Sequence, residues 1–230
     1  MAIDQDALAR DQFFGGVQGA RSYISFETKD WDPSVEAELP KYDPAAANAL
    51  LDEAGWVPGP DGIRVKDGVR LAPLGYFFTG STWQKLSEYT QAELRKIGVD
   101  LQVEIFDATV AWGKMATQEF DAFGMSYPYV SAGDALNLYF PSTNIPTPNR
   151  MNWKDPETDQ WLSEGKAALD DATRAGAYSK VLHKVHDANV WLPLIHEPRT
   201  IVSSKRLAPI VPHSNYGAAL YKGLDLKLVE

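Results

Sequence analysis

Three consecutive segments in the first half of the chain constrain its fold more than any other feature. The first, YDPAAANALLDEAGWV at 42–57, opens with Asp-Pro, a common N-cap and first-turn pair, and closes a helix at a glycine. The second, at 61–71, has apolar runs on both sides of Asp67-Gly68, which predicts a hairpin. The third, at 89–107, passes from helical spacing through Gly98 into alternating apolar residues, which predicts a helix and a half-buried strand. This order of elements indicates an α/β domain.

Similar patterns predict the remaining elements. Residues 17–41 and 128–153 contain several prolines, and we expect them to be irregular. Ser81 or Thr82 is the expected N-cap of the helix that follows the predicted strand over 74–78. We expect helices over 3–14, 43–55, 81–97, 109–118, 156–169 and 174–189, and strands over 63–65, 69–71, 74–78, 99–105, 120–127, 190–195 and 200–203.

Composition excludes several classes of protein. The 230 residues are 44% hydrophobic and carry a net charge of −9, which fits a folded soluble chain and argues against nucleic acid or an anionic membrane as partner. The absence of cysteine excludes a thiolate nucleophile and a disulfide framework, and fits either the cytoplasm or an exported protein without disulfides. No apolar stretch approaches the roughly 20 residues of a membrane span, and the N-terminus has no signal-peptide pattern.

Short motifs spread over residues 2–200 identify a family when they are taken as a set. They are Ala2–Leu8 with Gly15-Gly16, Tyr42-Asp43-Pro44, Leu50–Trp56, Asp61-Gly62, Asp67-Gly68, Gln91 with Leu94 and Lys96–Val99, Phe120-Asp121-Ala122, and Trp191–Leu194. The set resembles the C-terminal half of the extracellular solute-binding proteins of family 5. These proteins serve ABC transporters that carry oligopeptides, dipeptides, nickel chelates and some glycosides.

The resemblance implies a fold and a role. The fold is one lobe of a two-lobed, type II periplasmic-binding-protein-like structure, an α/β lobe with a mixed sheet flanked by helices. Residues 1–204 would form the C-terminal ligand-binding lobe, a fragment of a longer receptor, and residues 205–230 a tail that returns toward the missing N-terminal lobe. The receptor would be a monomer in the periplasm, or extracytoplasmic and lipid-anchored. It would capture a solute between its lobes and deliver it to an ABC transporter permease, without a cofactor.

Two segments follow predicted strands and are rich in aromatic and small polar residues. Ligands of open α/β layers bind beyond the carboxyl ends of the strands, so we expect the solute at 77–83 and 127–134. One of the two adjacent phenylalanines in the first segment should point into the core instead. The predicted ligand-binding residues are Phe77, Phe78, Thr79, Trp83, Tyr127, Tyr129 and Ser131.

The charges near these segments bear on the class of ligand. The resemblance implies that dipeptide-binding members hold the peptide with an arginine near the first segment and an aspartate in the second. Here 77–83 contains no arginine, and Asp134 matches a structural position of the family. Because burying an unpaired zwitterion is costly, a neutral oligosaccharide or glycoside is favoured over a short peptide, although a peptide-like ligand stays open.

A hydrolase or a metal-binding module on the same lobe is the alternative. His183 and His186 share a helix face, but a metal site needs further convergent ligands, so we expect solvated histidines and no metal. Asp170-Asp171 is typical of a helix cap. The sequence contains no nucleophile elbow, phosphate loop or dinucleotide motif, and we expect no catalytic residues.

Overall fold

A computed structural model describes residues 1–26, 28–126, 129–198, 202–208 and 227–229. The helices are α1 (Gln5–Phe13), α2 (Pro33–Glu38), α3 (Pro44–Glu53), α4 (Ser81–Lys96), α5 (Ala108–Thr117), α6 (Ala132–Tyr139), α7 (Pro156–Ala167) and α8 (Asp171–Asp187). The strands are β1 (Gln18–Gly19), β2 (Val57–Pro58), β3 (Arg64–Lys66), β4 (Val69–Arg70), β5 (Leu74–Phe78), β6 (Gln102–Phe106), β7 (Ala122–Phe123) and β8 (Ile195–His196).

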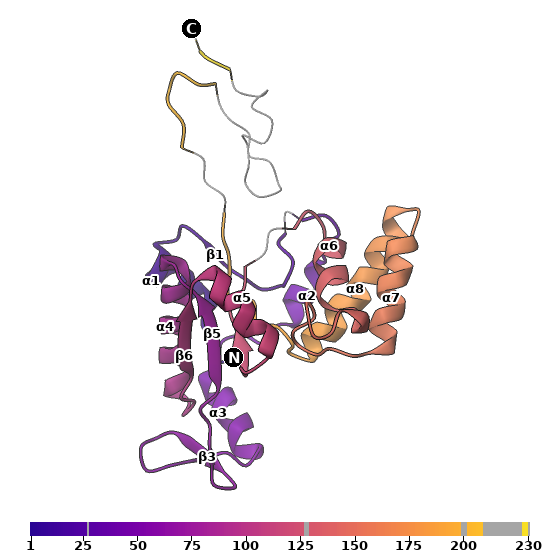
Figure 1. The fold of residues 1–230 in the computed structure, drawn as a ribbon. Coiled ribbons are helices and arrows are strands. Elements are labelled where there is room, and N and C mark those ends of the chain that lie inside the picture. The colour runs from indigo at the N-terminus through magenta and orange to yellow at the C-terminus, as the bar shows by residue number, and fades with distance from the viewer. Residues whose placement is uncertain (27, 127–128, 199–201, 209–226, 230) are drawn as a thin grey trace.

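The sheet unit, which we define as β5, β6 and β7 with α4 and α5, confirms the predicted α/β class. Its strands run parallel in the order β6-β5-β7, and Phe78 lies opposite Phe106 at the carboxyl end. Parallel neighbours need a crossover, which α4 supplies between β5 and β6. Figure 1 shows α4 and α5 on opposite sides of the sheet. Antiparallel pairing occurs in two separate small sheets, β2-β3-β4 and β1-β8.

The predicted hairpin is confirmed, and one arginine ties it to the helices. Asp67 and Gly68 have φ angles of 50° and 79°, the left-handed turn that joins β3 to β4. Arg64 at the start of β3 is only 4% exposed. Its guanidinium donates to the carbonyl of Ile97 at 2.8 Å and to Asn48 Oδ1 at 2.7 Å. These bonds fix the hairpin against α3 and the end of α4.

The helical unit, which we define as α2, α6, α7 and α8, holds the largest core of the described residues. Figure 1 shows α7 and α8 lying along each other beside α6. Trp191 packs on this core, with its ring 4.8 Å from Phe140 and 5.2 Å from Tyr23. Tyr178 fills the space between α6 and α7 so tightly that a Cβ at Gly133 would lie 2.6 Å from its ring. The glycine therefore permits the close packing of these helices.

The two stretches expected to be irregular both contain a helix. Asp32-Pro33 starts α2, because the Asp32 carboxylate accepts from the amide of Ser34 and Pro33 occupies the first turn. Residues 132–139 form α6, whose buried positions belong to the large core. The prolines at 141, 146 and 148 follow α6 and do not interrupt it. The prediction was wrong because a proline disrupts the interior of a helix, whereas these prolines begin a helix or follow one.

Other boundaries also differ from the prediction. The N-cap of α4 is Gly80, with φ 142° and no side-chain cap bond, and not Ser81 or Thr82. The strand predicted over 120–127 is only the two-residue β7. The strand predicted over 190–195 is replaced by the short β8. Val202 and Ser203 lie outside regular structure, whereas 200–201 and most of the tail after 208 lie outside the described residues.

Candidate ligand-binding face

An aromatic strip lies at the carboxyl end of the parallel sheet. We define the aromatic strip as Phe78, Trp83 and Trp112, which come from the end of β5, the first turn of α4 and α5. The ring of Phe78 is 5.8 Å from Trp83 and 5.2 Å from Trp112. Trp112 keeps 42% of its surface exposed, and the other two are half-buried. The strip therefore offers apolar, stacking surface where ligands of α/β folds bind.

Strand alternation explains how the strip is built. Tyr76 and Phe78 point to the α5 side of β5, where Tyr76 is buried against Met115. Phe77 points to the other side and is 6% exposed, with its ring 6.5 Å from Trp83. The phenylalanine that enters the core is thus Phe77, and its ring packs near that of Trp83. A direct ligand contact of Phe77 stays a prediction.

Thr79 lies beside the strip. Its side chain is exposed, and its amide donates to the carbonyl of Phe106 at 2.7 Å, which extends the pairing of β5 and β6 by one residue. Gly80 then turns the chain into α4 with a backbone conformation that only glycine adopts readily. A contact of the Thr79 hydroxyl with a solute stays a prediction.

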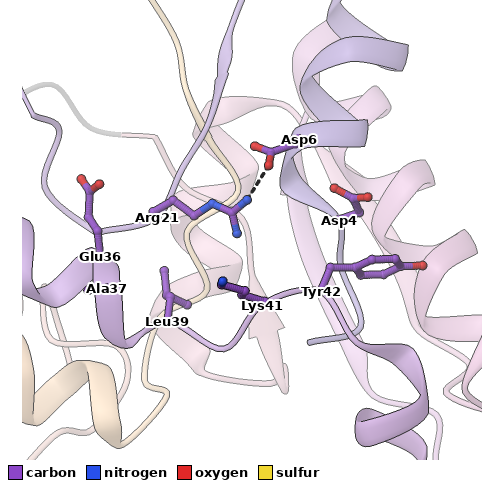
Figure 2. Close-up of a pocket in the computed structure, with 8 residues that line it drawn as sticks. All are labelled: Asp4, Asp6, Arg21, Glu36, Ala37, Leu39, Lys41 and Tyr42. Atoms are coloured by element: carbon purple, nitrogen blue, oxygen red, sulfur yellow. Dashed lines mark hydrogen bonds and ion pairs between the residues drawn. The ribbon is translucent and has the colours of Figure 1, made fainter.

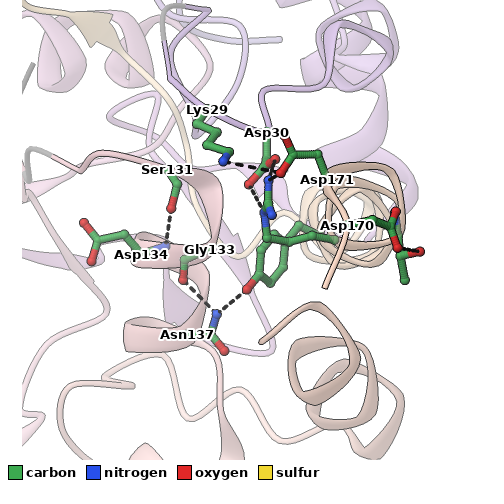
Figure 3. Close-up of polar contacts among 11 residues, drawn as sticks. Lys29, Asp30, Ser131, Gly133, Asp134, Asn137, Asp170 and Asp171 are labelled. Carbon is green, nitrogen blue, oxygen red and sulfur yellow. Dashed lines mark hydrogen bonds and ion pairs between the residues drawn. The ribbon is translucent and has the colours of Figure 1, made fainter. Parts of the chain in front are cut away.

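The second predicted segment is connected to the helical unit. The hydroxyl of Tyr129 donates to the carbonyl of Tyr23 at 2.8 Å, and burial raises the pKa of Tyr129 to about 12. Ser131 caps α6 by accepting from the amide of Asp134 at 3.1 Å, as Figure 3 shows. Both residues therefore have structural roles, and their contact with a ligand stays a prediction. Tyr127 lies outside the described residues.

Arg150 is a candidate functional residue that sequence reasoning missed. Its guanidinium lies over the ring of Trp112, with the carbon 4.9 Å from the ring centroid, and so continues the aromatic strip. The sequence places no arginine in 77–83, but the fold brings Arg150 from a loop far along the chain onto Trp112, whose ring lies 5.2 Å from that of Phe78. The absence of an arginine within 77–83 therefore does not leave the aromatic strip without a cation beside it. No local pattern indicates this contact, because it depends on how the loop after α6 folds back.

A polar hollow lies between α1 and α2, away from the strip. It has a volume of about 610 Å³, and Figure 2 shows Arg21, Asp6 and Lys41 at its walls. Arg21 Nη2 lies 2.5 Å from an oxygen of Asp6. Asp4, another lining residue, accepts from the amide of Ala7 as the N-cap of α1. Several of its charged groups are thus engaged with each other or with a helix end, and the aromatic strip is the better candidate.

The histidines do not form the expected solvated pair. His186 is 5% exposed, and burial lowers its pKa, so the prediction was wrong for this residue. His183 is half-buried and lies between Glu38 at 2.6 Å and the hydroxyl of Ser34 at 3.0 Å. Within the described ranges, no three His, Cys, Asp or Glu side chains are placed to hold one metal ion.

Ser34, His183 and Glu38 lie in the same order as the serine, histidine and acid of a catalytic triad. Their hydrogen bonds differ from those of a triad. A nucleophilic hydroxyl must give its proton to the imidazole. The hydroxyl of Ser34 donates instead to Asp32 at 2.6 Å, which is shorter than its contact with His183. We interpret this cluster as a polar link between α2 and α8.

Comparison with known proteins identifies the family. The model of the bacterial extracellular solute-binding proteins, family 5 (middle region), matches residues 1–147, more than half of the chain. The chain belongs to family 5. This family 5 chain is 29% identical over 178 residues to the nickel-binding periplasmic protein of Escherichia coli K12. It is 28% identical over 216 residues to the glutathione-binding protein GsiB of Pectobacterium atrosepticum.

The solved structures agree on the fold of the family 5 chain. The oligopeptide-binding protein AppA of Bacillus subtilis, solved with a nonapeptide, superposes with a TM-score of 0.82 at 21% identity, over 100% of this chain and 46% of AppA. A periplasmic oligopeptide-binding protein of Thermotoga maritima, solved with mannohexaose, gives 0.74 at 20% identity, over 84% and 39%.

Coverage of the relatives is partial. The matches span 74% of this chain and 33% of the nickel-binding protein, and 90% of this chain and 39% of GsiB. The chain thus corresponds to less than half of the length of these relatives. Among the described helices, none is both long and apolar enough to cross a membrane.

Proposed function

We propose that this chain is a lobe of a substrate-binding component of an ABC importer, and that it captures a solute on the aromatic strip. The observation that carries the proposal is the half-exposed strip at the carboxyl ends of β5 and β6, in a chain of a solute-binding family. An ABC transporter permease as partner and a periplasmic location are parts of this proposal, and membership of the family supports both. A second lobe would cover the strip, because the chain matches less than half of each relative.

The solute should combine an apolar or planar part with polar groups. Two partly exposed indole rings give stacking surface, and Thr79 adds an exposed hydroxyl at the edge of the sheet. Structures of similar fold were solved with a nonapeptide and with mannohexaose, so peptide-like and sugar-like solutes both merit testing. We assign the chain no reaction, because the family consists of binding proteins and Ser34 is not arranged as a nucleophile.

Ligand binding to the natural protein that contains this chain tests the proposal. A bound solute raises the apparent free energy of unfolding by about 2.7 kcal/mol at a hundredfold excess over the dissociation constant. We expect the melting temperature to rise with members of a peptide and oligosaccharide panel, and tryptophan fluorescence to change.

A matched pair of variants locates the site. Trp112→Leu should reduce the affinity by roughly two- to tenfold, since stacked aromatic contacts contribute about 0.5–1.5 kcal/mol beyond burial. Trp161→Leu should leave affinity unchanged, because Trp161 packs on α8 and the large core. Equal losses in both variants, or no stabilisation by any solute in the panel, would contradict the proposal.

A further inference from the structure

The residue that ends α5 has a backbone conformation that is unusual for a glutamine. Gln118 caps the helix with φ 56° and ψ 30°, the left-handed region that a Cβ disfavours and in which glycine is the usual residue. Asn152, in the loop before α7, also has a left-handed φ, of 54°. Such a conformation persists where the surrounding contacts impose it, which directs attention to the side-chain contacts of Gln118.

The side-chain amide of Gln118 is bonded to this loop. Its Nε2 donates to the carbonyl of Arg150 and to Asn152 Oδ1, both at 3.2 Å, with a longer contact of 3.4 Å to the carbonyl of Pro146. Asn152 Nδ2 donates back to Gln118 Oε1 at 3.3 Å. Both the donor and the acceptor of each amide are thus used. We define these bonds as the amide latch.

The other side of the loop is anchored in the helical unit. Asn149 is fully buried, and its side-chain amide donates to the carbonyls of Pro141 and Trp153 at 3.0 and 2.8 Å. Trp153 packs against the large core, and its indole N–H donates to the hydroxyl of Thr158 on α7 at 3.2 Å. The amide latch therefore joins α5 of the sheet unit to a loop that is fixed to the helical unit.

The amide latch lies next to the aromatic strip. Trp112 is on the same helix as Gln118, six residues earlier. The guanidinium of Arg150, whose carbonyl accepts from Gln118, covers the Trp112 ring at 4.9 Å. The latch thus fixes both the helix that carries Trp112 and the backbone of the residue that covers it.

We propose that Gln118 is a positioning residue for solute capture: the amide latch holds the loop at 146–152 against the aromatic strip and keeps the binding face in one arrangement. This inference rests on the proposed function and adds a residue that acts through Trp112 without touching the solute. Without the latch, only a fraction of the molecules has the loop in place, and the apparent dissociation constant rises by the inverse of that fraction. A loss equivalent to one net hydrogen bond corresponds to roughly two- to tenfold in affinity.

Gln118→Gly separates positioning from stability. Glycine relieves the left-handed backbone at 118 while the amide is lost, so the melting temperature of the free protein should change little. We would titrate the natural protein that contains this chain with mannohexaose and with a panel of nonapeptides, the ligands of two structures of similar fold. Calorimetry should give a dissociation constant roughly two- to tenfold higher in the variant.

Phe14→Gly is the matched control. Phe14 caps α1 with φ 54° and ψ 30°, nearly the conformation of Gln118. Its side chain is 89% exposed, with the ring 5.8 Å from the ammonium of Lys85 on α4. Figure 1 shows α1 on the α4 side of the sheet, away from α5. Phe14→Gly should therefore relieve a similar backbone conformation and leave the dissociation constant unchanged.

An exchange of the two amides assigns the effect to their pairing. Gln118→Asn shortens one partner and should weaken solute binding as Gln118→Gly does. Adding Asn152→Gln restores the combined length of the two side chains, so the double variant should recover part of the affinity. A role of Gln118 in helix capping alone predicts no such recovery, because Asn152 lies outside α5.

Trp112 reports on the latch in the absence of solute. One face of its ring is covered by Arg150, so a loosened loop should expose the ring to a soluble quencher. Acrylamide should quench the tryptophan fluorescence of Gln118→Gly more strongly than that of the wild type. The difference should disappear when both proteins also carry Trp112→Phe. Equal quenching of Gln118→Gly and wild type would overturn the inference.

Each binding outcome bears on one of the two proposals. If the wild type binds none of the probes, the capture function fails for these solutes and the positioning role fails with it. If the wild type binds a probe and Gln118→Gly binds it equally well, capture stands and the positioning role is wrong. Equal losses in Gln118→Gly and Phe14→Gly, or a double variant no better than Gln118→Asn, would also overturn it. If Gln118→Gly does not fold, Gln118→Asn and the double variant still decide.

Discussion

The helical unit and the sheet unit use their aromatic residues in opposite ways. In the helical unit, Phe140 and Tyr139 are nearly inaccessible, and Trp191 packs against both. In the sheet unit, Phe78 and Trp112 contact each other at the end of the sheet but stay partly exposed. The first arrangement buries its aromatic surface in a core, and the second leaves part of it exposed to solvent. Under the proposed function, this difference separates a supporting region from a binding region within one chain.

The same truncation in both units should give the largest contrast. Phe140 is fully buried, so Phe140→Ala should lower the free energy of unfolding by about 3–5 kcal/mol. Phe78 is half-buried at the end of a strand, and Phe78→Ala should cost about 1–2 kcal/mol. Chemical denaturation of both variants measures the difference. An equal loss of unfolding free energy in both variants would show that the strip is part of the core. The proposed difference between the two units would then be wrong.

Two glycines in the helical unit should respond in opposite directions to the same change. A Cβ at Gly133 would lie 2.6 Å from the Tyr178 ring, so Gly133→Ala should destabilise by about 1–3 kcal/mol. Gly176 lies on α8 with nothing within 4 Å of its Cβ position, so Gly176→Ala should stabilise by about 0.5–1 kcal/mol. Thermal unfolding of the two variants tests this. A neutral Gly133→Ala would mean that α6 and α7 are looser than the structure shows.

The hairpin and the two units differ in how much of each could be predicted from the sequence. The hairpin at Asp67-Gly68 and the α4–β6 pair were predictable, because turn chemistry and periodicity are local. The residues α6 contributes to the core were missed, since short apolar helices next to prolines have weak local patterns. Arg150 was beyond prediction for another reason. Its contact with Trp112 joins residues 38 apart in sequence through a loop whose path no local rule determines.

His186 should make the stability of the helical unit fall as the pH falls. The buried ring lies 5.5 Å from Tyr23, and its Nε2 has no hydrogen-bond partner among the described residues. Burial lowers the pKa of His186, while Asp187 and Glu38 oppose this effect and His183 adds slightly to it. Its pKa in the folded state is thus below the ordinary value of about 6.5 in the unfolded state. The unfolded chain takes up the proton first, so the contribution to stability is complete above about pH 6.5 and is lost as the pH falls toward the folded-state pKa.

A variant that cannot titrate isolates this contribution. We expect the melting temperature of the wild type to fall between about pH 7.5 and about pH 5.5, well above the range in which the aspartates are protonated. His186→Leu should reduce this slope, whatever its effect on stability at neutral pH. His196, whose pKa is also lowered by burial, lies on β8 outside the helical unit and provides the comparison. If His196→Leu flattens the profile and His186→Leu does not, the pH-sensitive packing belongs to the β1–β8 pair. The helical unit would then be more acid-resistant than the β1–β8 pair.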